Sequence, residues 1–270
     1  MQKRIKLLSA VYLLYLALNI ISGRLSGWIS DTVFLSSFAL PTLLALAYVK
    51  KEDKGDITAY LSVDGEGIKA TLVFFAPTLL LTASVSAMTA VVLKIFAGEF
   101  NTPSVPDNFL IAILASALLP ALIEEIMFRY LPMRVLAGVD RGRAIMLSSL
   151  FFAFAHVSLY QIPYALVAGF LFMLLDIMTG SILPSLILHF FNNLFSLVLI
   201  FFGEDLTVKI SVNVIGSLLF ALSAVLFVRE RKKILGKIRE IFTPGESEAC
   251  LAPLLFVIPA FLVSLGEFFV

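Results

Sequence analysis

Long apolar stretches alternate with short polar segments along most of the chain. A membrane-spanning helix needs about 20 mostly apolar residues. The fifth and sixth apolar stretches are short and nearly adjacent, which is typical of a tilted hairpin, and prolines interrupt the last one. The first could be mistaken for a signal peptide, but no cleavage site follows it, so we expect it to remain as a span. The pattern predicts nine spanning helices, at approximately residues 6–23, 31–49, 69–97, 108–133, 143–160, 162–179, 182–202, 209–228 and 250–269.

Composition supports the same class of protein. Hydrophobic residues make up 60% of the 270 residues and charged residues only 14%, with a mean hydropathy of +1.01. Soluble domains have about 45–50% apolar and about 25% charged residues. We therefore expect an all-α, polytopic membrane protein with eight or nine transmembrane helices around an intramembrane cavity. The net charge of +1 gives no sign of a nucleic-acid partner, and the single cysteine, Cys250, excludes an internal disulfide and a cysteine-based zinc site.

The basic residues form four clusters, which would all lie on one side of the membrane if every predicted span crosses once. Cytoplasmic loops are enriched in Lys and Arg, so we expect a cytoplasmic N-terminus. No organellar address is visible in the sequence, so we expect a prokaryotic cell membrane. With nine spans the C-terminus would lie outside, and Arg24 is the exception to the pattern. The clusters are Lys3, Arg4 and Lys6; Lys50, Lys51 and Lys54; Arg134, Arg141 and Arg143; and Arg229, Arg231, Lys232, Lys233, Lys237 and Arg239.

We expect a single membrane domain over residues 1–270, because the chain contains no internal repeat and no low-complexity tract. Residues 229–242 combine basic and apolar side chains, which is typical of an amphipathic helix that lies on anionic lipid. The alternative for this segment is a docking helix for a protein partner.

Several strongly polar residues lie inside the predicted spans. A central Asp, Lys or Arg costs about 2.5–3.5 kcal/mol in hydrocarbon, so such residues usually face a protein interior or a water-filled cavity. Both histidines of the chain belong to this set. Its members are Glu124, Glu125, Arg129, His156, Asp176, His189, Asn192 and Asn193.

Helix geometry separates the two adjacent glutamates. Glu125 and Arg129 are four residues apart, so they share a helix face and can pair. Glu124 is rotated by about 100° from that face and can meet histidines of other helices. This geometry predicts a supporting role for Glu125 and a chemical role for Glu124. His189 and Asn193 share a face in the same way.

Each of these residues also has a purely structural explanation. Arg129 could form a simple ion pair with Glu125 while its side chain reaches the interface. His189 and Asn193 could be interhelical hydrogen-bond partners. Asp176 lies close to a predicted turn, so we expect it to reach the interface or to cap a helix rather than to take part in chemistry.

Three short motifs fall in order on successive predicted spans. Together they resemble the CPBP family, which comprises CAAX proteases and bacteriocin-processing or abortive-infection membrane proteins. The resemblance covers about residues 108–200, within a motif-bearing core at 108–202. The motifs are EEIMFR at 124–129, FAFAH at 152–156 and HFFNN at 189–193, which match EExxxR, FxxxH and HxxxN.

The resemblance implies an intramembrane protease. Type II CAAX prenyl endopeptidases of this family have an eight-helix core with a cavity open to the cytosol. They remove the last three residues from a prenylated CAAX C-terminus and are regarded as glutamate-dependent, with no metal or other cofactor. The expected partners are therefore a lipidated or membrane-embedded peptide substrate and membrane lipids.

The same resemblance suggests a role for each motif residue. Glu124 would be the general base and would act with His156 on a water molecule, while His189 and Asn193 would form the oxyanion site. His189 lies about 10 Å into its span and His156 lies late in the fifth, so a short or tilted fifth span is needed to bring them level. The residues expected to support these four are Glu125, Arg129 and Phe152.

Other functions fit the residues less well. The HExxH motif and the serine and aspartate motifs GxSG and GxGD are absent. Glu124, His156 and His189 form an alternative zinc set, because two histidines and a glutamate are a known catalytic combination. A non-catalytic scaffold or immunity protein is a further alternative, against which the intact motifs argue. A proton-coupled transporter would use intramembrane Glu and His, but the chain shows no repeated half.

Overall fold

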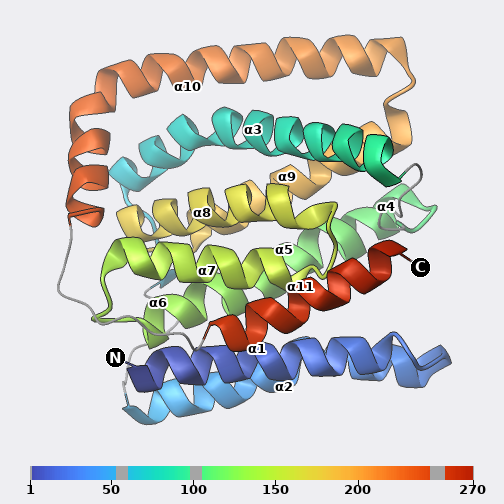
Figure 1. Cartoon of the computed structure of the whole chain (residues 1–270). Helices are drawn as coiled ribbons and strands as arrows, with labels where there is room; N and C mark the ends of the chain where they lie inside the picture. Colours follow the sequence, from blue (N-terminus) through green and yellow to red (C-terminus); the bar gives the residue numbers. More distant parts are fainter. Residues whose placement is uncertain (1, 53–59, 98–104, 244–252, 270) are drawn as a thin grey trace.

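The computed structural model describes residues 2–52, 60–97, 105–243 and 253–269, and every regular element in these ranges is a helix (Figure 1). Cys250 and Lys54 lie outside the described residues. Seven helices in these ranges are long and apolar enough to cross a membrane. They are α1 (Gln2–Ser22), α2 (Gly27–Glu52), α3 (Gly65–Ala97), the interrupted helix Phe109–Val135, α8 (Gln161–Thr179), α9 (Leu183–Phe202) and α10 (Leu206–Ile241).

The two remaining helices, α7 (Arg141–Ala155) and α11 (Leu254–Phe269), are shorter. The chain is thus an all-α, polytopic integral membrane protein, as predicted, although seven rather than nine of its described helices meet the length and hydropathy of a span. The predicted fifth span, 143–160, is wrong at its end because α7 stops at Ala155. α7 has only 15 residues. A short helix at this place is one of the two ways, named above, in which His156 could come level with His189.

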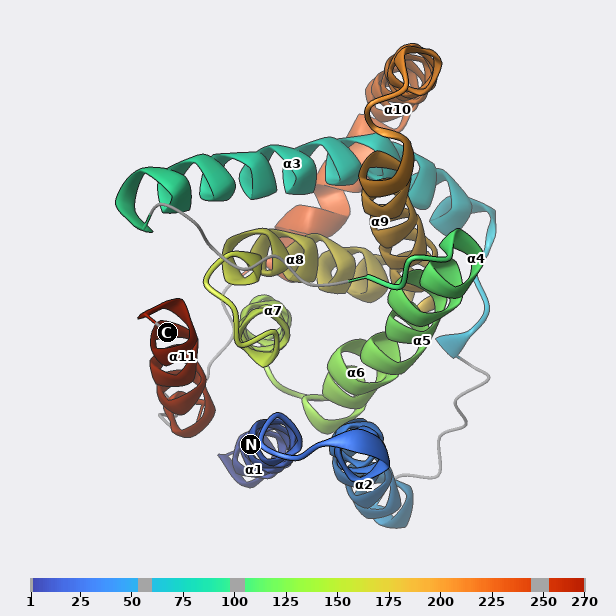
Figure 2. The same cartoon turned by 90° about the vertical axis from the view of Figure 1, so that its right-hand side faces the viewer.

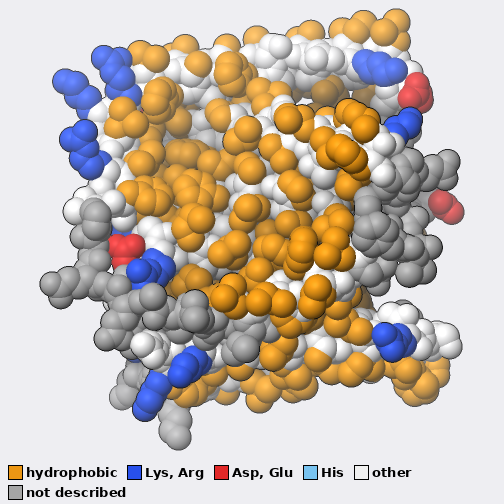
Figure 3. All heavy atoms as spheres, in the orientation of Figure 1, with side chains coloured by type: hydrophobic (Ala, Val, Ile, Leu, Met, Phe, Trp, Pro, Cys, Tyr) orange, Lys and Arg blue, Asp and Glu red, His pale blue; other side chains and the backbone are white. Residues whose placement is uncertain are grey.

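The helices pack side by side in alternating directions, so that the described basic clusters meet at one end of the bundle (Figure 1). In Figure 2, α7 and α8 lie at the centre, α1 and α2 on one side, and α3 and α10 on the other. Hydrophobic side chains cover the middle of the face in Figure 3, and most of its Lys and Arg lie at the end where α1 begins. The clusters therefore share one side, and the assignment of that side to the cytoplasm stays a prediction.

Residues 229–242 continue α10 rather than forming a separate helix. Figure 1 shows the last turns of α10 bending back toward the ends of α7 and α8. Ile234 and Ile241 are buried in this contact, and Lys233 Nζ lies 3.1 Å from Glu66 Oε2 at the start of α3. One face of the segment thus docks on the protein itself, and its contact with lipid stays a prediction.

The helix that carries the first motif, which we call the motif helix (Phe109–Val135), is not a regular α-helix. Its α-helical parts are α4 (Phe109–Ala112), α5 (Leu119–Glu125) and α6 (Leu131–Val135). Two π-helical segments, Ile113–Leu118 and Ile126–Tyr130, separate them. Each is followed by a Leu-Pro pair, at 119–120 and 131–132. In each pair the leucine N–H bonds to the carbonyl five residues back, and the proline has no N–H to give.

The second Leu-Pro pair leaves two carbonyl groups of the motif helix without their usual partners. The N–H of Leu131 is diverted from Met127 to Ile126, and Pro132 has none for Phe128. Side chains of other helices replace them. Tyr12 Oη of α1 donates to Met127 O at 2.7 Å, and Ser148 Oγ of α7 donates to Phe128 O. The motif helix is therefore held by α1 and α7 one turn after its two glutamates.

Candidate active site

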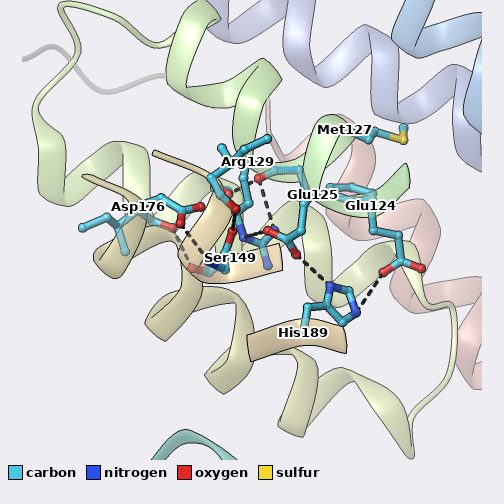
Figure 4. Close-up of polar contacts among 12 residues, drawn as sticks. Glu124, Glu125, Met127, Arg129, Ser149, Asp176 and His189 are labelled. Carbon is cyan, nitrogen blue, oxygen red and sulfur yellow. Dashed lines mark hydrogen bonds and ion pairs between the residues drawn. The ribbon is translucent and has the colours of Figure 1, made fainter. Parts of the chain in front are cut away.

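His189 lies between the two glutamates (Figure 4). Its Nδ1 is 2.7 Å from Glu125 Oε1, and its Nε2 is 3.8 Å from Glu124 Oε2. Because a carboxylate only accepts hydrogen bonds, the short contact assigns the proton to Nδ1. The contact to Glu124 is too long for a direct hydrogen bond. One carboxylate therefore orients the imidazole, and the other faces its second nitrogen across a gap.

The two glutamates differ in burial and in partners, as their positions on the helix predict. The side chain of Glu125 is fully buried, and its Oε2 lies 3.4 Å from Arg129 Nε. Glu124 is more accessible, with 17% of its side chain exposed. Glu125 is thus bound into the protein from both sides, whereas Glu124 keeps a carboxylate that a small molecule can reach.

Aromatic rings enclose the buried guanidinium of Arg129. Its Cζ lies 4.3 Å from the ring centroid of Phe152 in α7 and 5.5 Å from that of Phe172 in α8. These distances are in the range of cation–π contacts. Arg129 does not reach the interface, because its side chain is fully buried. Phe152 also meets both histidines edge-on, at 4.9 Å from His156 and 5.7 Å from His189.

His156 follows the last residue of α7 as its C-cap and is half-buried. Its Nδ1 lies 2.9 Å from the carbonyl oxygen of Phe152, one turn earlier. A carbonyl accepts, so Nδ1 carries the proton and Nε2 is left as an acceptor. In the described part of the chain no direct contact joins His156 to Glu124. The residue after His156 is strained, since Val157 is β-branched and has a φ of 49°.

The two asparagines of the third motif have different surroundings. Asn192 Oδ1 accepts a hydrogen bond from Thr82 Oγ1 of α3 at 2.7 Å, so Asn192 is the interhelical link. Asn193 lies one helical turn beyond His189 and is half-buried, and no hydrogen bond of its side chain is found among the described residues. Both ring nitrogens of His189 face carboxylates, so its pairing with Asn193 at one oxyanion stays a prediction.

Three further residues support the helices of the site, and only Asp176 among them was singled out from the sequence. Asp176 was expected to reach the interface or to cap a helix, and it caps one, since it is fully buried and accepts from Ser185 N of α9 at 3.2 Å. Tyr12 and Tyr15 of α1 were not considered, and Tyr15 Oη donates to Ala155 O at 3.1 Å. Pro132 was the available signal for Tyr12, because it removes a backbone donor from the motif helix.

The residues of the alternative zinc set do not gather around one point. Glu124 and His189 are neighbours, but His156 turns its Nδ1 to its own helix. Across the described ranges, no group of three or more His, Cys, Asp or Glu side chains is arranged to hold a metal ion. The arrangement instead offers an accessible carboxylate that faces one imidazole, that of His189, across 3.8 Å, which suits general base chemistry.

Residues 106–195 match the family of type II CAAX prenyl endopeptidases described as Rce1-like. This stretch is about a third of the chain and contains all three motifs, and the match is consistent with the CPBP family. No curated protein and no solved structure matches the chain. At the level of the family, the match supports a CAAX-type intramembrane protease whose substrate is a membrane-associated prenylated peptide.

Proposed function

We propose that this relative of the type II CAAX prenyl endopeptidases is a glutamate-dependent intramembrane endopeptidase. It cleaves near the C-terminus of a prenylated CAAX-type peptide or another membrane-associated peptide. The observation that carries the proposal is the unequal pair of adjacent glutamates. Glu125 is locked between Arg129 and His189, and Glu124 faces the same histidine across 3.8 Å with its carboxylate accessible.

The gap between Glu124 and His189 suits a reacting oxygen atom. Polar groups separated by more than about 3.5 Å are often bridged by water. Glu124 takes a proton from the attacking water, and the unprotonated Nε2 of His156 helps to orient it. The water oxygen bonds to the scissile carbonyl carbon. When the tetrahedral intermediate collapses, the C–N bond breaks and Glu124 returns the proton to the departing nitrogen.

The developing oxyanion needs hydrogen-bond donors. Asn193 can supply its amide, and His189 can supply Nε2–H when that nitrogen is protonated, with the imidazolium stabilised by Glu125. One such donor contributes about 10²–10³-fold in kcat. The buried pair of Glu125 and Arg129 has no proton to transfer in this scheme, so its part is to hold His189 in place.

The test is a cleavage assay on purified protein in detergent, with C-terminal peptides that are prenylated or not, with and without a chelator. We expect Glu124→Gln to lower kcat by about 10²–10⁴-fold while the protein stays folded. Glu204→Gln is the matched control, because Glu204 is fully exposed and remote from the motifs. Chelator should have no effect.

Each other result separates an alternative. Full activity of Glu124→Gln would reject the glutamate mechanism. Loss of cleavage in chelator, restored by zinc, would favour the zinc-dependent protease. If folded wild-type protein cleaves none of the peptides, the scaffold and transporter hypotheses gain, and flux into proteoliposomes would then distinguish those two.

A further inference from the structure

Asp176 is a buried carboxylate that the proposed chemistry does not use. It lies in the last turn of α8, with its whole side chain inaccessible. Its Oδ1 accepts a hydrogen bond from the backbone N–H of Ser185, in the first turn of α9. The first N–H groups of a helix have no partner within the helix. Asp176 thus caps the helix that carries His189.

The cap and a ring contact both join α8 to α9. Asp176 and Phe172 are four residues apart and share a face of α8, while Ser185 and His189 are four apart and share a face of α9. Asp176 bonds to Ser185, and the ring of Phe172 packs on that of His189, with centroids 5.5 Å apart. A short turn at Gly180, which has a φ of 71°, joins the two helices. The bond between Asp176 and Ser185 therefore determines that His189 is the residue of α9 that lies against Phe172.

The site tolerates little sliding of α9. One residue of helix corresponds to about 1.5 Å along the axis. The contact of His189 Nδ1 with Glu125 is 2.7 Å long, and a separation of about 3.6 Å is no longer a hydrogen bond. A slip of a single residue is enough to break it and to move Nε2 relative to Glu124.

We propose that Asp176 is a positioning residue, which holds α9 through the Ser185 N–H in the register that places His189 between Glu124 and Glu125. In Figure 4, Asp176 lies beyond Arg129 and Ser149, on the side away from His189. It touches none of the reacting groups, and its hydrogen bond leads to α9. The inference rests on the proposed function only where it links this register to cleavage.

The experiment uses nuclear magnetic resonance of full-length protein labelled with ¹⁵N at histidine. The chain has only two histidines, and a His156→Gln variant assigns their signals. His189 should give a low-field Nδ1–H resonance from its bond to Glu125. The His156 resonance, which reports its bond to Phe152 O, serves as an internal check of the fold.

Two nearly isosteric substitutions test the hydrogen bond. Asp176→Asn keeps an oxygen that accepts from Ser185, and we expect it to keep the low-field His189 signal and kcat within about twofold. Asp176→Leu has no acceptor, and we expect it to lose that signal, keep the His156 signal, and lower kcat about 10²-fold, as misplacement by about 1 Å can do. If the leucine variant loses the His156 signal too, Asp176→Ala replaces it.

The inference is refuted if the acceptor-free variant keeps the His189 signal, or if Asp176→Asn behaves like Asp176→Leu. The resonance of His189 is read without substrate. A wild-type protein that cleaves no peptide would therefore count against the proposed function, while the spectra would still decide whether Asp176 positions His189.

Discussion

Removing one hydroxyl from α1 should weaken the whole bundle, because that hydroxyl is the replacement donor for the motif helix. Tyr12→Phe keeps the ring, which is fully buried, stacks on Phe128 at 5.0 Å and packs against Phe151 at 4.5 Å. It removes only the bond to Met127 O, which is 2.7 Å long. The substitution therefore isolates the cost of one unsatisfied carbonyl.

The cost of Tyr12→Phe can be estimated because neither of the next two backbone positions of the helix offers an N–H to Met127 O. Leu131 N–H is already bonded to Ile126 O, and Pro132 has no N–H. A buried acceptor left unpaired costs about 1–3 kcal/mol. Since about 1.4 kcal/mol corresponds to a factor of ten, Tyr12→Phe should lower the ratio of folded to unfolded protein by roughly 5- to 150-fold.

The assay is equilibrium unfolding in mixed micelles, followed by helical circular dichroism. Ser9→Ala is the matched control, because Ser9 is also buried in α1 and its hydroxyl donates to Ile5 O within the same helix. That carbonyl keeps its own helical partner, so the control leaves no acceptor unpaired and should cost clearly less than Tyr12→Phe.

A double-mutant cycle with Pro132→Ala tests the stated cause. Alanine restores an N–H at position 132, so that Leu131 can bond to Met127 O and the tyrosine hydroxyl becomes redundant. Tyr12→Phe should then cost less than about 1 kcal/mol. An equal cost in both backgrounds would show that the diverted hydrogen bond is not the reason for the tyrosine, and a cost no larger than that of Ser9→Ala would refute the reasoning altogether.

Three substitutions near the site should also change stability, as thermal unfolding in detergent can measure. Gly169→Ala should cost about 1–3 kcal/mol, because the new Cβ would lie 3.1 Å from Ser149 Cα. An unchanged melting temperature would mean that α7 and α8 move apart by a few tenths of an ångström at little cost. Val157→Gly should stabilise by on the order of 1 kcal/mol, since it relieves a β-branched residue at positive φ, and a loss of stability would contradict this. Arg129→Met should cost about 3–5 kcal/mol, because it leaves Glu125 buried without its cation, and adding Glu125→Gln should recover part of the loss.

The central helices could be predicted almost to the residue, for local reasons. The expected spans 162–179 and 182–202 correspond to α8 and α9, which begin and end within one residue of those limits. Gly180 supplies the left-handed residue that ends α8, and Pro184 suits the first turn of α9. Apolar content and turn residues both act locally, so the sequence alone is sufficient there.

Two helix ends could not be predicted from apolar content. α7 stops at Ala155 although the residues after it are still mostly apolar, because the backbone turns at Val157. α10 continues to Ile241 through a run of charges. Charged side chains favour water over lipid, but Lys, Arg and Glu are good helix formers. The apolar span and the basic segment therefore form one helix.

Within the site, spacing predicted contacts on one helix better than contacts between helices. The pair of Glu125 and Arg129 follows from a separation of four residues, and it is present at 3.4 Å. Which histidine would lie beside Glu124 depends on how α7 and α9 are rotated and shifted against the motif helix. Spacing along one helix does not contain that information, and the direct neighbour is His189 rather than His156.

Unpaired backbone groups could have supplied part of the missing information. Pro132 removes a donor from the motif helix, and the start of α9 leaves the N–H of Ser185 without a partner. In hydrocarbon each such group costs several kcal/mol if it stays unpaired, and a polar side chain on another helix is one way to pair it. The apolar spans contain few candidates, and two of them, Tyr12 and Asp176, make these bonds. Matching orphaned backbone groups to the polar residues of other spans therefore predicts contacts between helices, which hydropathy and motif spacing leave open.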